Sequence, residues 1–202
     1  TLQDGRMVFN GAIFRSEYDD KQESILIPVN LANVATVIRN AASMEMNGLE
    51  LELMYQVTEA WDLMVTYGYL EAEYKDYLAD LTGDGVITDN SGLIPRNTPE
   101  NTFGITTSYT TQVGDGELKG RISYRFRDEM NSDSSNNPYG DLDSIENLNA
   151  TINYSIDNYS ITIWGRNLTD EREQRWATIG GLTSRGWWNE PQTLGITFSA
   201  SY

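Results

Sequence analysis

The chain of 202 residues contains no cysteine and no histidine. Without cysteine there is no disulfide framework and no thiolate chemistry. Without histidine the chain lacks the commonest general base, the commonest metal ligand and the usual axial ligand of haem. No other nucleophile–base pair stands out, so the sequence predicts no catalytic residue and a function other than that of an enzyme.

Long apolar runs and basic residues are also scarce. No stretch of about 18 apolar residues could form a transmembrane helix. Lysine and arginine number 14 against 30 aspartates and glutamates, which gives a net charge of −16 and argues against a nucleic-acid partner. The balance fits cations, cationic ligands or simply solubility, and solvated acidic loops are the preferred interpretation. Because the chain begins with Thr1 and no secretory signal precedes it, we expect it to be part of a longer precursor.

What the chain does have is strict alternation, clearest in residues 193–202. Leu194, Ile196, Phe198, Ala200 and Tyr202 are apolar or aromatic, and every residue between them is small and polar or is glycine. A period of two predicts a β-strand, since successive side chains leave opposite faces. One apolar face opposite one small polar face is typical of a strand in a membrane barrel.

Similar alternation predicts about eight antiparallel, up-and-down strands, so the expected fold class is all-β, a transmembrane β-barrel segment. The expected strands are residues 6–19, 48–55, 61–74, 101–112, 117–127, 147–156, 159–166 and 193–202. Residues 20–43 are expected to be a large loop, with short β pieces at 24–28 and 35–39.

The connections alternate long and short, as in outer-membrane barrels with short periplasmic turns and long extracellular loops. The aromatic residues also fit a belt at each membrane interface. Those expected at the periplasmic belt are Trp61 and Tyr202, and those expected toward the outer belt are Tyr69, Tyr74, Trp187 and Trp188.

Four stretches resemble the carboxyl-terminal part of a TonB-dependent outer-membrane receptor. Residues 47–52 (NGLELE) resemble a strand opening of that family, and residues 94–103 (IPRNTPENTF) resemble its entry into a descending strand. Residues 165–171 (GRNLTDE) resemble its Asn-Leu-x-Asp-Glu strand end, and residues 191–202 resemble its final strand. Their order and spacing agree with the family.

The resemblance implies a barrel of about twenty-two strands around an amino-terminal plug, in the outer membrane of a Gram-negative bacterium. Residues 1–202 would supply the carboxyl-terminal strands only, without the plug. Implied partners are outer-membrane lipid, the plug and remaining strands, TonB, and the barrel-assembly machinery, which would read Gly195, Phe198 and Tyr202. The implied function is energised uptake of a scarce nutrient, most often a ferric siderophore.

Two other functions stay open at this stage. The chain could be a complete eight-stranded barrel with an adhesive or structural role, since eight strands can close around side chains. It could instead be a soluble calcium- or glycan-binding β domain. Within the family, cobalamin, haem and oligosaccharides are further substrates, although the absence of histidine gives haem no support.

Residues 80–91 resemble a calcium-binding loop of the EF-hand type. The candidate ligands are Asp80, Thr82, Asp84, the Val86 carbonyl and, out of register, Asp89. Ser91 stands at the twelfth position, where such a loop needs a bidentate acid. An acidic surface loop without a cofactor is therefore the preferred interpretation.

Charged residues on two predicted strands are expected to face the barrel lumen. They are Lys119, Arg121, Arg125 and Arg127 on one strand, and Glu50 and Glu52 on another. This face would contact the plug or steer an anionic ligand such as a ferric chelate. The preferred alternative is a solvated, ion-paired interior without a ligand.

Overall fold

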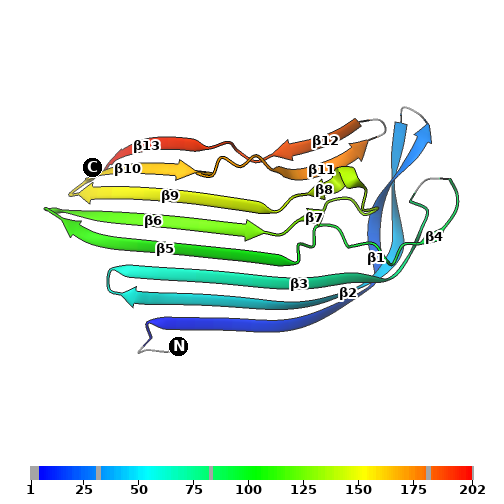
Figure 1. The fold of residues 1–202 in the computed structure, drawn as a ribbon, viewed down its shortest axis with the longest axis horizontal. Coiled ribbons are helices and arrows are strands. Elements are labelled where there is room, and N and C mark those ends of the chain that lie inside the picture. The colour runs from blue at the N-terminus through cyan, green and yellow to red at the C-terminus, as the bar shows by residue number, and fades with distance from the viewer. Residues whose placement is uncertain (1–4, 31–32, 82–83, 181–182, 202) are drawn as a thin grey trace.

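The computed structural model describes residues 5–30, 33–81, 84–180 and 183–201. Within them, eight strands follow one another through the main sheet, as the alternation predicted, and one further short strand pairs at its side (Figure 1). The eight are β1 (Met7–Asn30), β2 (Asn33–Thr58), β3 (Trp61–Ala79), β5 (Asn101–Val113), β6 (Gly116–Arg127), β9 (Ile145–Ile156), β10 (Tyr159–Arg166) and β13 (Thr193–Ala200). Among these residues, no helix has the length and apolar character needed to cross a membrane.

The strands lie in chain order, each antiparallel to the next. Tight turns join β2 to β3, β5 to β6 and β9 to β10, all at one end of the sheet, where the chain ends also lie (Figure 1). Gly114 and Asp157 take the positive φ angles that such two-residue turns require (+61° and +49°). The predicted short connections are therefore confirmed.

The register carries the sequence alternation across the whole sheet and gives it two different faces. On the face that we call apolar, one row contains Val65, Ile105, Tyr124 and Leu148, each paired with the next. The face that we call polar shows Asp62, Thr106, Ser123 and Asn149. Each strand thus contributes one side to each face.

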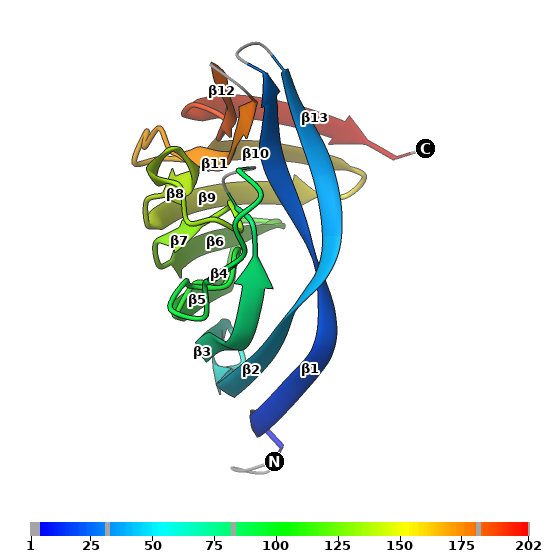
Figure 2. The same cartoon turned by 90° about the vertical axis from the view of Figure 1, so that its right-hand side faces the viewer.

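The prediction of a loop at residues 20–43 was wrong. β1 and β2 stay paired from Met7↔Tyr55 to Asn30↔Asn33, with irregularities between Tyr18 and Lys21 and between Pro28 and Asn30. A bulge adds one residue to one strand and so reverses which residues face inward. The alternation is lost at these points, although the pairing is not. The outer half of this hairpin turns and runs across the ends of the other strands (Figure 2).

The other long connections carry small elements of their own, at the end opposite the tight turns (Figure 1). β4 (Thr88–Asp89) pairs with β3. β7 (Met130–Asn131) pairs with β8 (Asp141–Leu142), and the 3₁₀ turn η1 (Pro138–Gly140) lies between them. β11 (Gln174–Gly180) and β12 (Thr183–Trp188) form a separate hairpin.

A small core of buried residues lies at this same end and joins the long hairpin to the outer part of β3, with Leu81 and Leu93 of the following loop packed against it. It consists of Met44, Tyr74, Tyr77 and Ala79, with the rings of Tyr74 and Tyr77 centred 4.6 Å apart. The prediction that Tyr74 belongs to an aromatic belt is wrong, since only 3% of it is exposed. The irregularity between Ser43 and Met44 against β3 brings Tyr74 and Tyr77 to one side.

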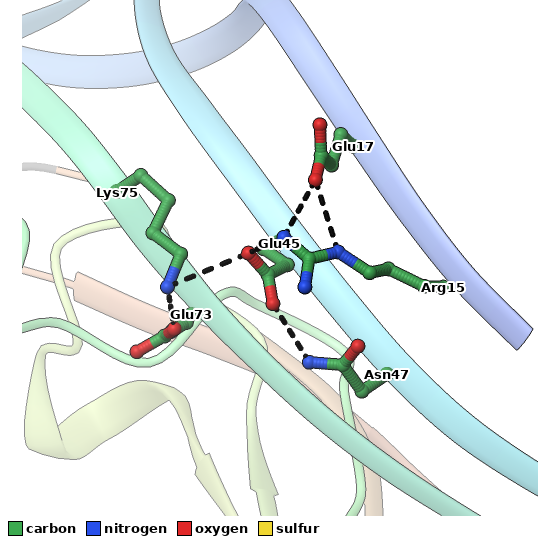
Figure 3. A network of polar contacts seen from close by, with 6 residues as sticks. All are labelled: Arg15, Glu17, Glu45, Asn47, Glu73 and Lys75. Carbon is green, nitrogen blue, oxygen red and sulfur yellow. Dashed lines mark hydrogen bonds and ion pairs between the residues drawn. The ribbon is translucent and has the colours of Figure 1, made fainter.

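The apolar face ends at the row formed by Ile13, Leu49 and Tyr69. Beyond it, the same face carries a network that we call the charged belt (Figure 3). The belt consists of Arg15, Glu17, Glu45, Asn47, Glu73 and Lys75. Arg15 Nη2 lies 2.8 Å from Glu45 Oε2, which is 3.5 Å from Lys75 Nζ. The outward surface therefore changes from apolar to charged within one row of residues.

Candidate binding site on the polar face

The four cations predicted to share a face do so, and we call them the basic wall. Lys119, Arg121, Arg125 and Arg127 all project from the polar face of β6. Their partners on β5 are Thr110, Ser108, Gly104 and Thr102, and their partners on β9 are Asn153, Thr151, Asn147 and Ile145. No neighbour across either ladder is acidic. β6 therefore presents a row of positive charge whose cross-strand partners are uncharged, with Glu117 at one end of the row and Glu173 close to Arg127 at the other.

Glu50 and Glu52 also lie on the polar face, but on β2. Glu52 accepts a hydrogen bond from Asn10 Nδ2 at 3.1 Å. β3 and β5 separate these glutamates from the basic wall, a distance of about 14 Å at the usual spacing of strands. Within the described part of the chain, no ion pair links the two groups.

A pocket of about 690 Å³ opens on the polar face beside the basic wall, at the end with the long connections. We call it the Trp164 pocket. Its lining includes Asn147 and Asn149 of β9, Trp164 and Arg166 of β10, Arg175 of β11 and Trp188 of β12. Four strands thus contribute to one site.

Trp164 is held flat against the neighbouring strand. Its partner on β13 is Gly195, and a Cβ added there would lie 2.2 Å from Trp164 Cζ2. The Trp164 Nε1–H donates to Thr197 Oγ1 at 3.1 Å. The Arg166 guanidinium carbon lies over the same indole, 5.2 Å from the ring centroid. The glycine therefore makes room for the indole.

The turn after β10 holds the elements around the pocket together. Asn167 is buried at φ +48°, a left-handed conformation that asparagine tolerates well. Its N–H donates to Asn149 Oδ1 at 3.0 Å, and its Nδ2 donates to the carbonyls of Glu171 and Glu190, both at 2.9 Å. The Asn-Leu-Thr-Asp-Glu motif thus ties β9 and β10 to the segment that enters β13.

Glu173 lies next to the Trp164 pocket, in the connection between β10 and β11. Its Oε1 accepts the Glu146 N–H at 3.1 Å, and the Asn189 N–H donates to its carbonyl at 2.9 Å. Burial, assisted by a hydrogen bond with Glu171, raises the pKa of Glu173 to about 7. The carboxyl can therefore change protonation state near neutral pH.

A second buried acid, Glu23, anchors the long hairpin. Its side chain is fully buried between Lys21, Arg96 and Tyr74. Arg96 Nε lies 3.4 Å from Glu23 Oε2, and the Tyr74 hydroxyl donates to Glu23 Oε1 at 2.9 Å. Burial and the nearby Glu23 charge raise the pKa of Tyr77 to about 12. This cluster links β1, β3 and the loop before β5.

The acids of the predicted calcium loop serve as acceptors for backbone N–H groups. Asp80 accepts from Gly85 at 2.8 Å, Asp84 from Val86 at 2.8 Å and Asp89 from Ser91 at 3.0 Å. Thr82 lies outside the described residues. No group of three metal-binding side chains occurs in the part of the chain that the structure describes. Calcium binding stays a prediction.

The residues of the predicted assembly signal fall on different faces. Phe198 is 77% exposed on the apolar face, and Gly195 lies on the polar face under Trp164. Tyr202 lies outside the described residues. Recognition of these residues by the assembly machinery stays a prediction. The packing of Trp164 on Gly195 gives a separate reason for a glycine at that position.

Sequence reasoning singled out neither the Trp164 pocket nor the Glu23 cluster. One signal for the pocket was present: Trp164 is the one aromatic residue among Ser160, Thr162 and Arg166 on the polar side of its strand. Its contributors on β11 and β12 come from a segment expected to be a loop. For Glu23, the bulge in β1 removed the pattern that would have marked an inward side chain.

Comparison with known proteins gives one family and several solved structures. The model of the family described as "TonB dependent receptor-like, beta-barrel" matches residues 1–168. The ferric yersiniabactin uptake receptor FyuA of Yersinia pestis is similar with a TM-score of 0.79 and 16% identity, over 99% of this chain and 28% of that one. The siderophore receptor PiuA of Acinetobacter baumannii is similar with a TM-score of 0.72 and 21% identity, over 98% of this chain and 26% of that one.

The ferric-catecholate import receptor Fiu of E. coli K12 is similar with a TM-score of 0.69 and 20% identity, over 98% of this chain and 26% of that one. At these identities the likeness shows a shared fold. The chain spans about a quarter of the length of these receptors.

Proposed function

The chain belongs to the TonB-dependent receptor-like β-barrel family, and on that premise we propose that it forms part of the barrel wall of a receptor that takes up a ferric siderophore across the outer membrane of a Gram-negative bacterium. Members of this family are receptors and transporters rather than enzymes. In such a barrel the apolar face meets lipid and the polar face lines the lumen. The basic wall and the Trp164 pocket then face the path of the substrate.

The basic wall is the observation that carries this proposal. The chain has a net charge of −16, yet four cations lie together on the polar face of β6 without acidic neighbours across either ladder. A cluster of positive charge on a lumen wall attracts anions and raises their local concentration. Many ferric chelates are anionic, and the similar receptors named above include a siderophore receptor, a ferric yersiniabactin uptake receptor and a ferric-catecholate import receptor.

The partners of this function are also proposals. The remaining barrel strands would pair with the free edges of β1 and β13, the plug would fill the lumen, and TonB would supply the energy. A closed eight-stranded barrel is not favoured, because β1 and β13 end the sheet order and do not pair with each other within the described residues. The soluble calcium- or glycan-binding domain is not favoured either, given the family match.

Charge reversal on the basic wall tests the proposal in the full-length receptor. Arg121 and Arg125 are suited to it because both are exposed and neither donates a hydrogen bond that holds a loop, whereas Arg127 donates to the Asp143 carbonyl at 2.9 Å. We expect Arg121→Glu with Arg125→Glu to reduce uptake of ⁵⁵Fe-labelled siderophore by about tenfold or more, and the double lysine variant to retain most of it.

Two results would count against this role. Unchanged uptake in the double glutamate variant would show that the wall does not steer the ligand. Reduced uptake together with new sensitivity to a large antibiotic would show that the wall seats the plug. The second result would assign the cations to plug contact instead.

A further inference from the structure

The Trp164 pocket combines two indoles with several N–H donors. Trp164 forms its floor and is fixed there by Thr197 and by the absence of a side chain at Gly195. Trp188 stands at its edge on β12 and is 64% exposed. Because the Trp164 ring is covered by β13 at Gly195 and has Arg166 over it, the aromatic face that is free for stacking is that of Trp188.

Two arginines lie close to these rings. Arg166 and Arg175 both line the pocket, and Glu190 is the one acid among the described residues of its lining. The basic wall continues this charge, because Arg125 pairs directly with Asn147 at the pocket. Guanidinium groups bind flat anionic oxygens through paired N–H donors and also stack on aromatic rings.

The size of the pocket fits one chelating arm of a siderophore or one whole small chelate. Its volume of about 690 Å³ falls within the range of about 300–1,000 Å³ that is usual for sites of small ligands. The lining adds amide side chains from Asn147 and Asn149 to the two arginines. The site therefore suits a planar, aromatic and anionic group.

We propose that the Trp164 pocket binds an aryl chelating arm, a catecholate or phenolate, of a ferric siderophore. This inference rests on the function proposed above and narrows its substrate class. Hydroxamate and carboxylate chelates carry no aromatic ring, so they would leave the exposed Trp188 indole without a stacking partner. The arginines bind the chelating oxygens, Trp188 stacks on the ring, and Trp164 forms the rigid floor beneath.

Binding measurements on the purified full-length receptor test this inference. The probes are two aryl chelates, ferric enterobactin and ferric pyochelin, and two chelates without an aryl group, ferrioxamine B and ferric citrate. We expect an aryl chelate to bind, and Trp188→Ala to weaken that binding by about tenfold or more. Trp188→Phe retains a ring and should restore most of the affinity.

The neighbouring residues supply matched controls. Trp187 is 73% exposed on the same strand but does not line the pocket, so Trp187→Ala should change affinity less than twofold. Arg175→Gln should weaken binding severalfold, whereas Arg172→Gln, which also lies outside the pocket lining, should not. Because these substitutions lie at exposed positions, the barrel should fold in each case.

The outcomes separate this inference from the proposed function. If the receptor binds only the chelates without an aryl group, or if Trp188→Ala and Trp187→Ala behave alike, the aryl subsite is wrong and siderophore uptake stands. If none of the four ferric chelates binds, the proposed function fails and the subsite fails with it.

Discussion

At the scale of single residues, Trp164 and Gly195 form a matched pair on neighbouring strands. The glycine has no side chain, and the indole occupies the space that a Cβ would need. Such pairing of a large aromatic with a cross-strand glycine stabilises a sheet and fixes the ring. The same glycine is also part of the predicted assembly signal, so its two roles need to be separated.

A double-mutant cycle separates them. We expect Gly195→Ala to destabilise the folded barrel by about 1–3 kcal/mol, because the new methyl displaces the indole from Thr197. In a Trp164→Ala background the same change should be nearly neutral. The fraction of folded receptor on unheated gels, combined with urea titration, measures both. Equal loss in the two backgrounds would favour the assembly role and argue against packing.

Glu173 gives the receptor a local dependence on pH. Since its folded pKa of about 7 is raised above the ordinary value of 4.5, ionisation opposes the folded arrangement. The stability that it contributes is complete at acidic pH and is lost as the pH rises through about 7. We expect the amide of Glu146 to exchange more slowly at pH 5 than at pH 8, after correction for intrinsic rates.

Substitution of Glu173 by glutamine should abolish that difference, because the neutral amide mimics the protonated acid at every pH. Glu171→Gln provides the control. Removing that neighbour takes away one cause of the raised pKa, so the transition should move to lower pH rather than disappear. An unaltered pH profile in the Glu173→Gln receptor would exclude this carboxyl as the titrating group.

At the scale of elements, the alternation predicted strands wherever their pairing is regular. β9, β10 and β13 have no register shift, and their predicted boundaries agree closely with the observed ones. β1 and β2 extend far beyond the prediction because bulges reverse the parity of their outer halves. A pattern of period two cannot be followed through such a change, which also misplaced Tyr74.

The candidate site likewise has one part that the sequence predicted and one part that it did not. The basic wall lies within one regular strand, so the sequence alone placed its four cations on one face. The Trp164 pocket needs contacts between β9, β10 and the β11–β12 hairpin, which depend on turn geometry at Asn167 and Asp170, both at positive φ. Contacts between distant segments leave no periodic signal in the sequence.

The outer half of the β1–β2 hairpin should depend on Glu23. Removing this buried carboxylate leaves Arg96 and Lys21 without their shared partner and Tyr74 without its acceptor. Since both cations are partly exposed, we expect Glu23→Ala to cost about 1–3 kcal/mol of local stability. Hydrogen exchange should accelerate in residues 15–30, while residues 7–14 of β1 should stay protected.

The charged belt offers the control for that change. Glu17 is 65% exposed and forms its ion pair at the surface, so Glu17→Gln should cost little, about 0–1 kcal/mol. If the two variants accelerate exchange equally, the hairpin is not anchored by the buried cluster.

At the scale of the whole molecule, charge is sorted by face and by height along the strands. Acidic residues outnumber basic ones in the chain, yet the polar face of β6 carries four cations. The charged belt on the opposite face contains both acidic and basic side chains. The apolar band between the belt and the tight turns is about as tall as a membrane requires. The paired stretch of β3 from Trp61 to Tyr69 has nine residues, and a membrane strand needs about 9–11. The height of the apolar band thus matches the span of a membrane strand.

This arrangement of charged and apolar residues predicts a sharp boundary between positions that a water-soluble reagent can label and positions that lipid covers. Because the chain contains no cysteine, single cysteines can be introduced to test it. Ile13 and Glu17 lie on one face of β1, about 13 Å apart at the usual rise of a strand. In a full-length receptor without other cysteines, a large membrane-impermeant maleimide added to whole cells should label Glu17→Cys and leave Ile13→Cys largely unlabelled. Asn158→Cys, in the tight turn after β9, should react only after the outer membrane is permeabilised. Labelling of Asn158→Cys in intact cells would reverse the orientation of the strands. Equal labelling of the first two positions would show that lipid does not end at the row of Ile13.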